Sequence, residues 1–151
     1  MTAAWDAARA RALIEDHRPV RGGLLPALHA LQRDFGYIDS AATPLLAEAF
    51  GLSQAEVHGV IAFYHEFRRT RPGRHVVRLC VAEACQARGA EALLAGLRER
   101  LGIGLGETSA DGAVTLEPVY CLGNCALGPA ALIDDELHGR LDGAGLAEAI
   151  G

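Results

Sequence analysis

The sequence predicts an α+β protein, in which a helical bundle over residues 1–71 precedes a small α+β domain over residues 72–151. Apolar residues recur at helical spacing through the first part, and Pro72-Gly73 marks a change of texture. Beyond it, a β-branched run is followed by a helical pattern and by further short strand-like runs. Half of the 151 residues are apolar, which is enough for a buried core and is not typical of a disordered chain.

The first part contains four predicted helices joined by short loops, which favours an antiparallel bundle. The second helix accommodates Pro26 because this proline lies in its first turn, and Gly36 ends it. The fourth opens with Ser53-Gln54-Ala55-Glu56, a capping box whose polar side chains satisfy free backbone N–H groups. The predicted helices cover residues 2–17, 24–35, about 40–50, and 53 onward.

The second part alternates strands and helices. Its first strand, over residues 75–80, is rich in β-branched residues, and the helix over residues 87–101 repeats leucine at helical spacing. The glycines at 102, 104 and 106 follow a helix rather than a strand, so they do not make a dinucleotide-binding fingerprint. The remaining predicted elements are a strand over 113–119, a hairpin of 130–134 with 136–141, and a helix over 146–150.

Charge and hydropathy argue against two classes of partner. The chain has 19 acidic and 14 basic side chains, whereas a protein that binds mainly nucleic acid needs a basic surface to neutralise phosphates. No apolar run approaches the roughly 20 residues that span a bilayer, and the N-terminus carries no recognisable secretory signal. We therefore expect a protein without membrane insertion that resides in the cytoplasm, where thiols stay reduced.

The four cysteines are predicted metal ligands. They form the pattern Cys80-x4-Cys85, then 35 residues, then Cys121-x3-Cys125, and each pair follows a predicted strand. If the two strands are neighbours, their loops meet at one edge of the sheet and present four thiolates as two pairs. A 2Fe-2S cluster needs this arrangement, because each tetrahedral iron takes two protein thiolates and shares two bridging sulfides. Small loop residues let main-chain N–H groups approach the sulfurs; they are Ala82, Ala84, Gly123 and Ala126.

Other uses of four cysteines stay open at this point. Structural zinc also takes four thiolates, although its paired cysteines are usually separated by two residues. A dithiol redox site would need Cys-x-x-Cys, and two disulfides would need an oxidising compartment. The spacing favours the cluster and leaves a structural zinc-binding interaction module as the alternative from a different class.

Two motifs around these cysteines resemble those of the thioredoxin-like 2Fe-2S ferredoxin family, which includes the 24-kDa subunit of respiratory complex I. The resemblance extends into the helical part and covers roughly residues 24–141. Two cysteine motifs in register make it specific. The matching segments are Cys80–Gln86 with Gly89-Ala90, Val119–Ala126 with Gly128-Pro129, Leu25–Ile38, and Val57–Tyr64.

The resemblance implies a helical bundle followed by a thioredoxin-like α/β domain that carries a 2Fe-2S cluster. The cluster ligands it implies are Cys80, Cys85, Cys121 and Cys125, and no residue of the chain would itself be catalytic. It also implies a partner subunit that binds FMN and NAD, with which the cluster exchanges electrons.

Within the family, Phe63–Arg68 and Ala82–Gln86 most resemble the gamma subunit of soluble NAD-dependent formate dehydrogenase. This similarity implies a further partner, a catalytic subunit with a molybdenum cofactor that oxidises formate and is reached through the flavin subunit. The equivalent subunits of NADH:quinone oxidoreductase and of NAD-linked hydrogenases are the alternatives.

Overall fold

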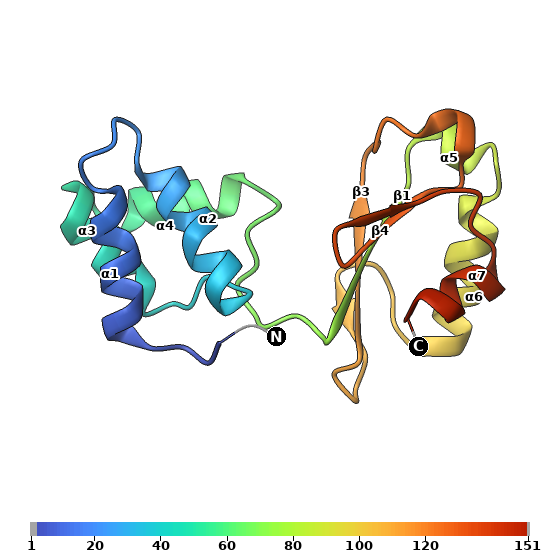
Figure 1. Ribbon diagram of the computed structural model, residues 1–151, viewed down its shortest axis with the longest axis horizontal. Coiled ribbons are helices and arrows are strands. Elements are labelled where there is room, and N and C mark those ends of the chain that lie inside the picture. The colour runs from blue at the N-terminus through green and yellow to red at the C-terminus, as the bar shows by residue number, and fades with distance from the viewer. Residues whose placement is uncertain (1–2, 151) are drawn as a thin grey trace. The chain divides into compact units, whose positions relative to one another are not determined.

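The computed structural model describes residues 3–150, and these divide into two compact units whose boundary falls between Arg71 and Pro72 (Figure 1). The first, here called the helical unit, contains four helices. The second, the sheet unit, contains a five-stranded sheet and the remaining helices. The α+β fold class predicted from the sequence is confirmed.

The helical unit packs its four helices around one buried core. Leu28, Leu31 and Phe35 from the second helix are fully buried in it, together with Val57 from the fourth. The helices are α1 (Ala7–His17), α2 (Leu24–Phe35), α3 (Ala42–Phe50) and α4 (Gln54–Phe63).

Local capping sets the ends of these helices. The capping box predicted at Ser53 is confirmed, since its hydroxyl accepts from the Glu56 N–H and the Glu56 carboxylate accepts from the Ser53 N–H. Gly36 ends α2 with a φ of 84°, a left-handed conformation that glycine adopts without strain. The first helix is shorter than predicted, because Asp6 caps it and fixes its start at Ala7.

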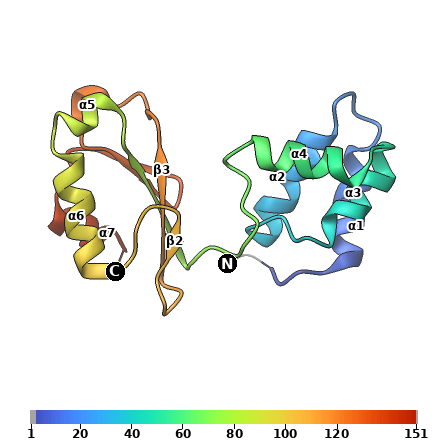
Figure 2. The same cartoon turned by 180° about the vertical axis from the view of Figure 1, so that it is seen from behind.

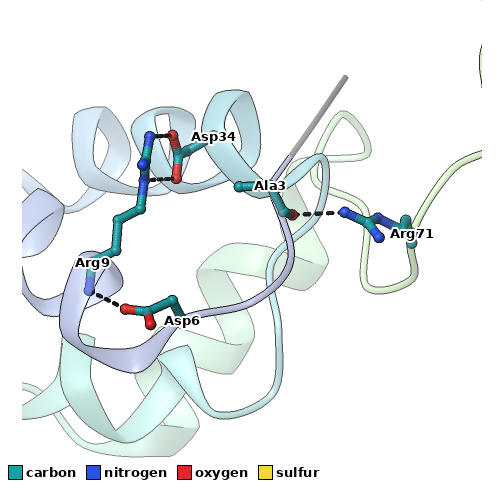
Figure 3. Close-up of polar contacts among 5 residues, drawn as sticks. All are labelled: Ala3, Asp6, Arg9, Asp34 and Arg71. Carbon is teal, nitrogen blue, oxygen red and sulfur yellow. Dashed lines mark hydrogen bonds and ion pairs between the residues drawn. The ribbon is translucent and has the colours of Figure 1, made fainter.

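Polar contacts fasten the N-terminal segment to the rest of the helical unit (Figure 3). Asp6 accepts a hydrogen bond from the Arg9 N–H at 2.7 Å, and the Arg9 guanidinium pairs with both carboxylate oxygens of Asp34 on α2. Arg71, the last residue of the unit, also holds this segment, since its guanidinium donates to the Ala3 carbonyl at 2.7 Å. The predicted helix start at Thr2, and the predicted domain ends at Met1 and Gly151, lie outside the described residues.

The sheet unit is built on a mixed sheet with the strand order β2-β3-β1-β4-β5. β1 pairs with β3 in parallel, whereas the other neighbouring strands are antiparallel. The strands are β1 (His75–Cys80), β2 (Glu107–Thr108), β3 (Val114–Val119), β4 (Ala131–Ile133) and β5 (Glu136–His138).

Three helices accompany this sheet, and Figures 1 and 2 show the two longer ones on the same face of it. Leu93 and Leu97 of α6 and Leu146 of α7 bury their side chains against Val77 and Leu116 of the strands. The helices are α5 (Glu83–Gln86), α6 (Ala90–Leu101) and α7 (Gly143–Ile150), and a 3₁₀ turn, η1 (Cys125–Leu127), precedes β4.

The structure corrects three predicted elements of the sheet unit, of which the last helix begins at Gly143 rather than at Leu146. The helix predicted over 87–101 begins only at Ala90, because Gly89 adopts a left-handed φ of 97° and separates it from α5. The hairpin is shorter than predicted, and β5 ends at His138 rather than at Leu141. β2 was not predicted. Among the described residues, no helix combines the length and the apolar character required to cross a bilayer.

Candidate metal centre

The parallel pairing of β1 with β3 brings the two cysteine loops to one end of the sheet. Cys80 is the last residue of β1 and is in register with Val119, the last residue of β3. Cys121 follows two residues later, and Cys125 opens η1. Figures 1 and 2 both show α5 and the loop after β3 together at this end of the sheet unit. The predicted meeting of the two loops is confirmed.

Backbone groups from both loops surround the sulfur of Cys80. The N–H groups of Ala82, Cys121 and Leu122 donate to it, and the Cys85 thiol is a further hydrogen-bond partner. Two of the three backbone donors belong to the second loop, so the contact between the loops is direct.

These contacts set the protonation of Cys80. Burial raises the pKa of its thiol, but the N–H donors and the Cys85 thiol outweigh burial, so that the pKa lies below its ordinary value. A thiolate is the form that binds a metal. The first ligand position is therefore prepared by the fold itself.

The neighbouring cysteines resist ionisation because they share one region of space. Burial and the hydrogen bond to Cys80 raise the pKa of Cys85, and the charges of Cys80 and Cys125 act in the same direction. The hydrogen bond and the charge of Cys121 raise the pKa of Cys125. Four thiolates here repel one another, and a bound cation would remove that repulsion.

The sulfurs are arranged as two pairs. The Sγ atoms of Cys121 and Cys125 are 3.7 Å apart, and both residues carry free thiols. Two thiolates on one tetrahedral ion, with metal–sulfur bonds of about 2.3 Å, lie about 3.8 Å apart. Cys80 and Cys85 are hydrogen-bonded to each other. Each pair can therefore serve one iron.

The donor set fits the cluster predicted from the sequence. A binuclear cluster needs two protein thiolates at each iron, whereas structural zinc needs four ligands around one point. The 3.7 Å between the sulfurs of Cys121 and Cys125 suits two thiolates on one iron.

The loop of Cys121 has a strained backbone. Cys121 adopts a φ of 103°, which few residues other than glycine adopt. Gly123 follows with a φ of 74°, and its N–H donates to the Cys121 sulfur at 3.4 Å. Backbone strain of this kind persists where the surrounding structure over-determines it, often at functional sites. Here it accompanies a loop whose N–H groups point at two sulfurs.

The two pairs differ in their access to solvent. Cys80 and Cys85 are each 2% exposed, whereas Cys121 and Cys125 are exposed. Two large apolar side chains flank the exposed pair, with Tyr120 77% and Leu127 39% exposed. One iron would thus lie inside the fold and the other at its surface.

The sequence located the four cysteines and part of their surroundings. The N–H groups of Ala82 and Gly123 donate to sulfur as predicted. It missed the donors Cys121, Leu122 and Ala130, the last of which bonds the Cys85 sulfur. It also missed the close approach of Gly128, where an added Cβ would lie 3.2 Å from the Cys85 sulfur. Gly128 itself, just after the second cysteine motif, was the sequence signal that could have indicated this close approach.

Comparison with known proteins identifies the family of the chain and several relatives. The model of the thioredoxin-like [2Fe-2S] ferredoxin family matches residues 10–151. An NADH-quinone oxidoreductase subunit from Pseudomonas aeruginosa is 39% identical over 130 residues, which make up 86% of this chain and 78% of the relative. The corresponding subunit from Escherichia coli is 35% identical, with the same coverage of both chains.

A solved structure gives the same result for the fold. The crystal structure of an NAD+-reducing [NiFe]-hydrogenase in the air-oxidised state matches with a TM-score of 0.73 and 31% identity over 85% of this chain. The matched part is only 22% of that hydrogenase chain. The family resemblance and the thioredoxin-like domain predicted from the sequence are confirmed. The chain belongs to the thioredoxin-like [2Fe-2S] ferredoxin family, and its cofactor is a 2Fe-2S cluster.

Proposed function

We propose that this chain is an electron-transfer subunit that holds its 2Fe-2S cluster on Cys80, Cys85, Cys121 and Cys125. The observation that carries the proposal is the arrangement of these thiols as two pairs at one end of β1 and β3. Cys80 and Cys85 would hold an inner iron, and Cys121 and Cys125 an outer one. No residue of the chain is proposed to be catalytic.

The protein's own part is to bind the cluster and to set its potential. When bound, the cluster supplies a one-electron redox centre, through which the subunit would exchange electrons with the FMN of a partner. The N–H groups that donate to the Cys80 sulfur stabilise negative charge there and so favour the reduced state. Burial of Cys80 and Cys85 excludes water from the inner ligands.

The proposed partner is a flavin- and NAD-binding subunit of the same complex. The support is the similarity to a subunit of NADH-quinone oxidoreductases and to part of an NAD+-reducing hydrogenase. The finer proposal is a soluble NAD-dependent formate dehydrogenase with a molybdenum-containing catalytic subunit, and it rests on the resemblance of Phe63–Arg68 and Ala82–Gln86 to its gamma subunit. We propose that the protein is cytoplasmic, does not bind nucleic acid and does not insert into a membrane.

Anaerobic purification tests the cluster assignment. We expect a red-brown protein with two irons and two acid-labile sulfides per chain, and a rhombic EPR signal on reduction. Cys121→Ser should lower iron content and alter the EPR signal, whereas Ala95→Ser, at an exposed position of α6 away from the cysteines, should not. A colourless protein with one zinc and no sulfide would refute the proposal.

Metal analysis of the native complex tests the choice of parent enzyme. Molybdenum or tungsten together with flavin would support the formate dehydrogenase. Nickel would replace that proposal with a hydrogenase, and neither metal would replace it with an assembly of the NADH-quinone oxidoreductase type.

A further inference from the structure

The segment after β5 lies against the turn that carries Cys125. The Arg140 N–H donates to the Leu127 carbonyl at 2.6 Å, and the Leu141 N–H donates to the Pro129 carbonyl at 3.1 Å. These two bonds reach residues just beyond Cys125 in the chain. We call the segment Gly139–Leu141 the strap.

Gly139 lets the strap approach the turn closely. A Cβ added at this position would lie 2.7 Å from the Asn124 side-chain nitrogen and 2.8 Å from the Leu127 carbonyl oxygen. Real Cβ atoms essentially never make contacts this short. Gly139 is not among the glycines with positive φ, so close packing rather than backbone conformation requires glycine here.

The turn itself contributes little to its own position. η1 is three residues long and buries none of them. Its internal hydrogen bonds are the Leu127 N–H to the Asn124 carbonyl at 3.0 Å and the Gly128 N–H to the Cys125 carbonyl at 3.4 Å. A short exposed turn of this kind needs contacts from elsewhere to hold one geometry.

The strap is in turn connected to the strand that ends in Cys80. His138, the residue before the strap, pairs with Ala131 of β4, and Ala131 pairs with Leu79 of β1. His138, Ala131 and Leu79 therefore lie in one row across the sheet. Through these contacts, the strap connects the turn that carries Cys125 to the strand that ends in Cys80.

We propose that the strap is a positioning element for the outer iron, which keeps the Cys125 thiol beside Cys121 and at a fixed place relative to Cys80. This inference rests on the proposed cluster ligands. Gly139 is a positioning residue, because it would act on the cluster through Asn124 and Leu127.

Gly139→Ala, made in the full chain, tests the strap. We expect the turn to shift, the EPR g-values and the reduction potential to change, and the loss of iron to a chelator to become about tenfold faster. Gly96→Ala in α6 is the matched control, since its added Cβ meets no atom within 4 Å. We expect that variant to keep the wild-type EPR signal and potential.

A second variant covers the case in which Gly139→Ala does not fold. Asn124→Ala removes the side chain that contacts Gly139 and adds no atoms, and we expect a smaller change of the EPR signal in the same direction. Wild-type g-values, potential and iron retention in every folded variant would overturn the strap while leaving the cluster proposal intact. Absence of iron and sulfide from the wild-type protein would instead overturn the cluster proposal.

Discussion

Cys80 and Cys121 occupy opposite environments within one site. Cys80 is 2% exposed and accepts hydrogen bonds from three backbone N–H groups, whereas Cys121 is exposed. Water could reach an iron held by the exposed Cys121 and Cys125, but not one held by the buried Cys80 and Cys85. If both are ligands as proposed, losing Cys80 should therefore have a different consequence from losing Cys121.

Comparison of Cys80→Ala with Cys121→Ala tests this inequality. Cys80→Ala leaves three backbone N–H donors without their sulfur acceptor. An unsatisfied buried group costs about 1–3 kcal/mol, which corresponds to roughly a tenfold or larger loss of bound iron. Cys121→Ala leaves a position that water can fill. We expect iron retention after anaerobic gel filtration to be clearly higher in Cys121→Ala, and equal losses in the two variants would contradict the inner and outer assignment.

Asp134 connects the β4–β5 hairpin to β1 through one side chain. Its carboxylate accepts from the Val76 N–H at 2.8 Å and lies 2.6 Å from the His75 ring nitrogen. Burial raises the pKa of Asp134, but the Val76 N–H and His75 outweigh burial, so that its pKa lies below the ordinary value. The stabilisation is therefore present above the ordinary carboxyl pKa and is lost as the pH falls through the folded-state value.

Asp134→Asn should lower the free energy of unfolding at neutral pH by about 1 kcal/mol, an estimate that allows for solvent screening of a half-exposed group. The backbone is expected to persist, because asparagine tolerates the φ of 49° at this position. Urea unfolding should show the difference shrinking below about pH 4. A difference that stays constant with pH would contradict the charge-based account, and Asp16→Asn on α1 is the exposed control.

At the scale of elements, the sequence predicted what local chemistry determines. The capping box at Ser53 and the end of α2 at Gly36 are set by neighbouring residues and were predicted correctly. β2 has two exposed residues and no alternating pattern, so it becomes a strand only through its pairing with β3. The sequence predicts the strap as part of a strand, because its contact with the Cys125 turn is not encoded in any local pattern.

The site shows the same division between local and distant information. Cysteine spacing predicted four ligands, which stay a prediction. The strand-like runs before each pair predicted a common edge of the sheet, and the pairing of β1 with β3 confirms it. The donors from Cys121 and Leu122 to the Cys80 sulfur depend on the strained φ of 103° at Cys121, which is unusual for a residue other than glycine. Sequence patterning gives no sign of such a conformation.

The whole molecule has a separate hydrophobic core in each unit. The core of the helical unit contains Leu28, and that of the sheet unit contains Leu116 of β3, both fully buried. The one tryptophan, Trp5, lies against Phe35 with ring centroids 5.0 Å apart, so its fluorescence reports on the helical unit. Visible absorption of the cluster reports on the sheet unit.

Leu28→Ala and Leu116→Ala should therefore separate the two signals. Each removes a fully buried side chain and should cost about 2–5 kcal/mol in its own unit. We expect Leu28→Ala to shift the Trp5 fluorescence transition in urea and to leave the absorbance transition in place, and Leu116→Ala to do the reverse, because each core is confined to one unit. Anaerobic urea titrations followed by both signals give the measurement. If both transitions move together in both variants, the units unfold as one cooperative body, and the helical unit then stabilises the cluster fold directly instead of folding independently beside it.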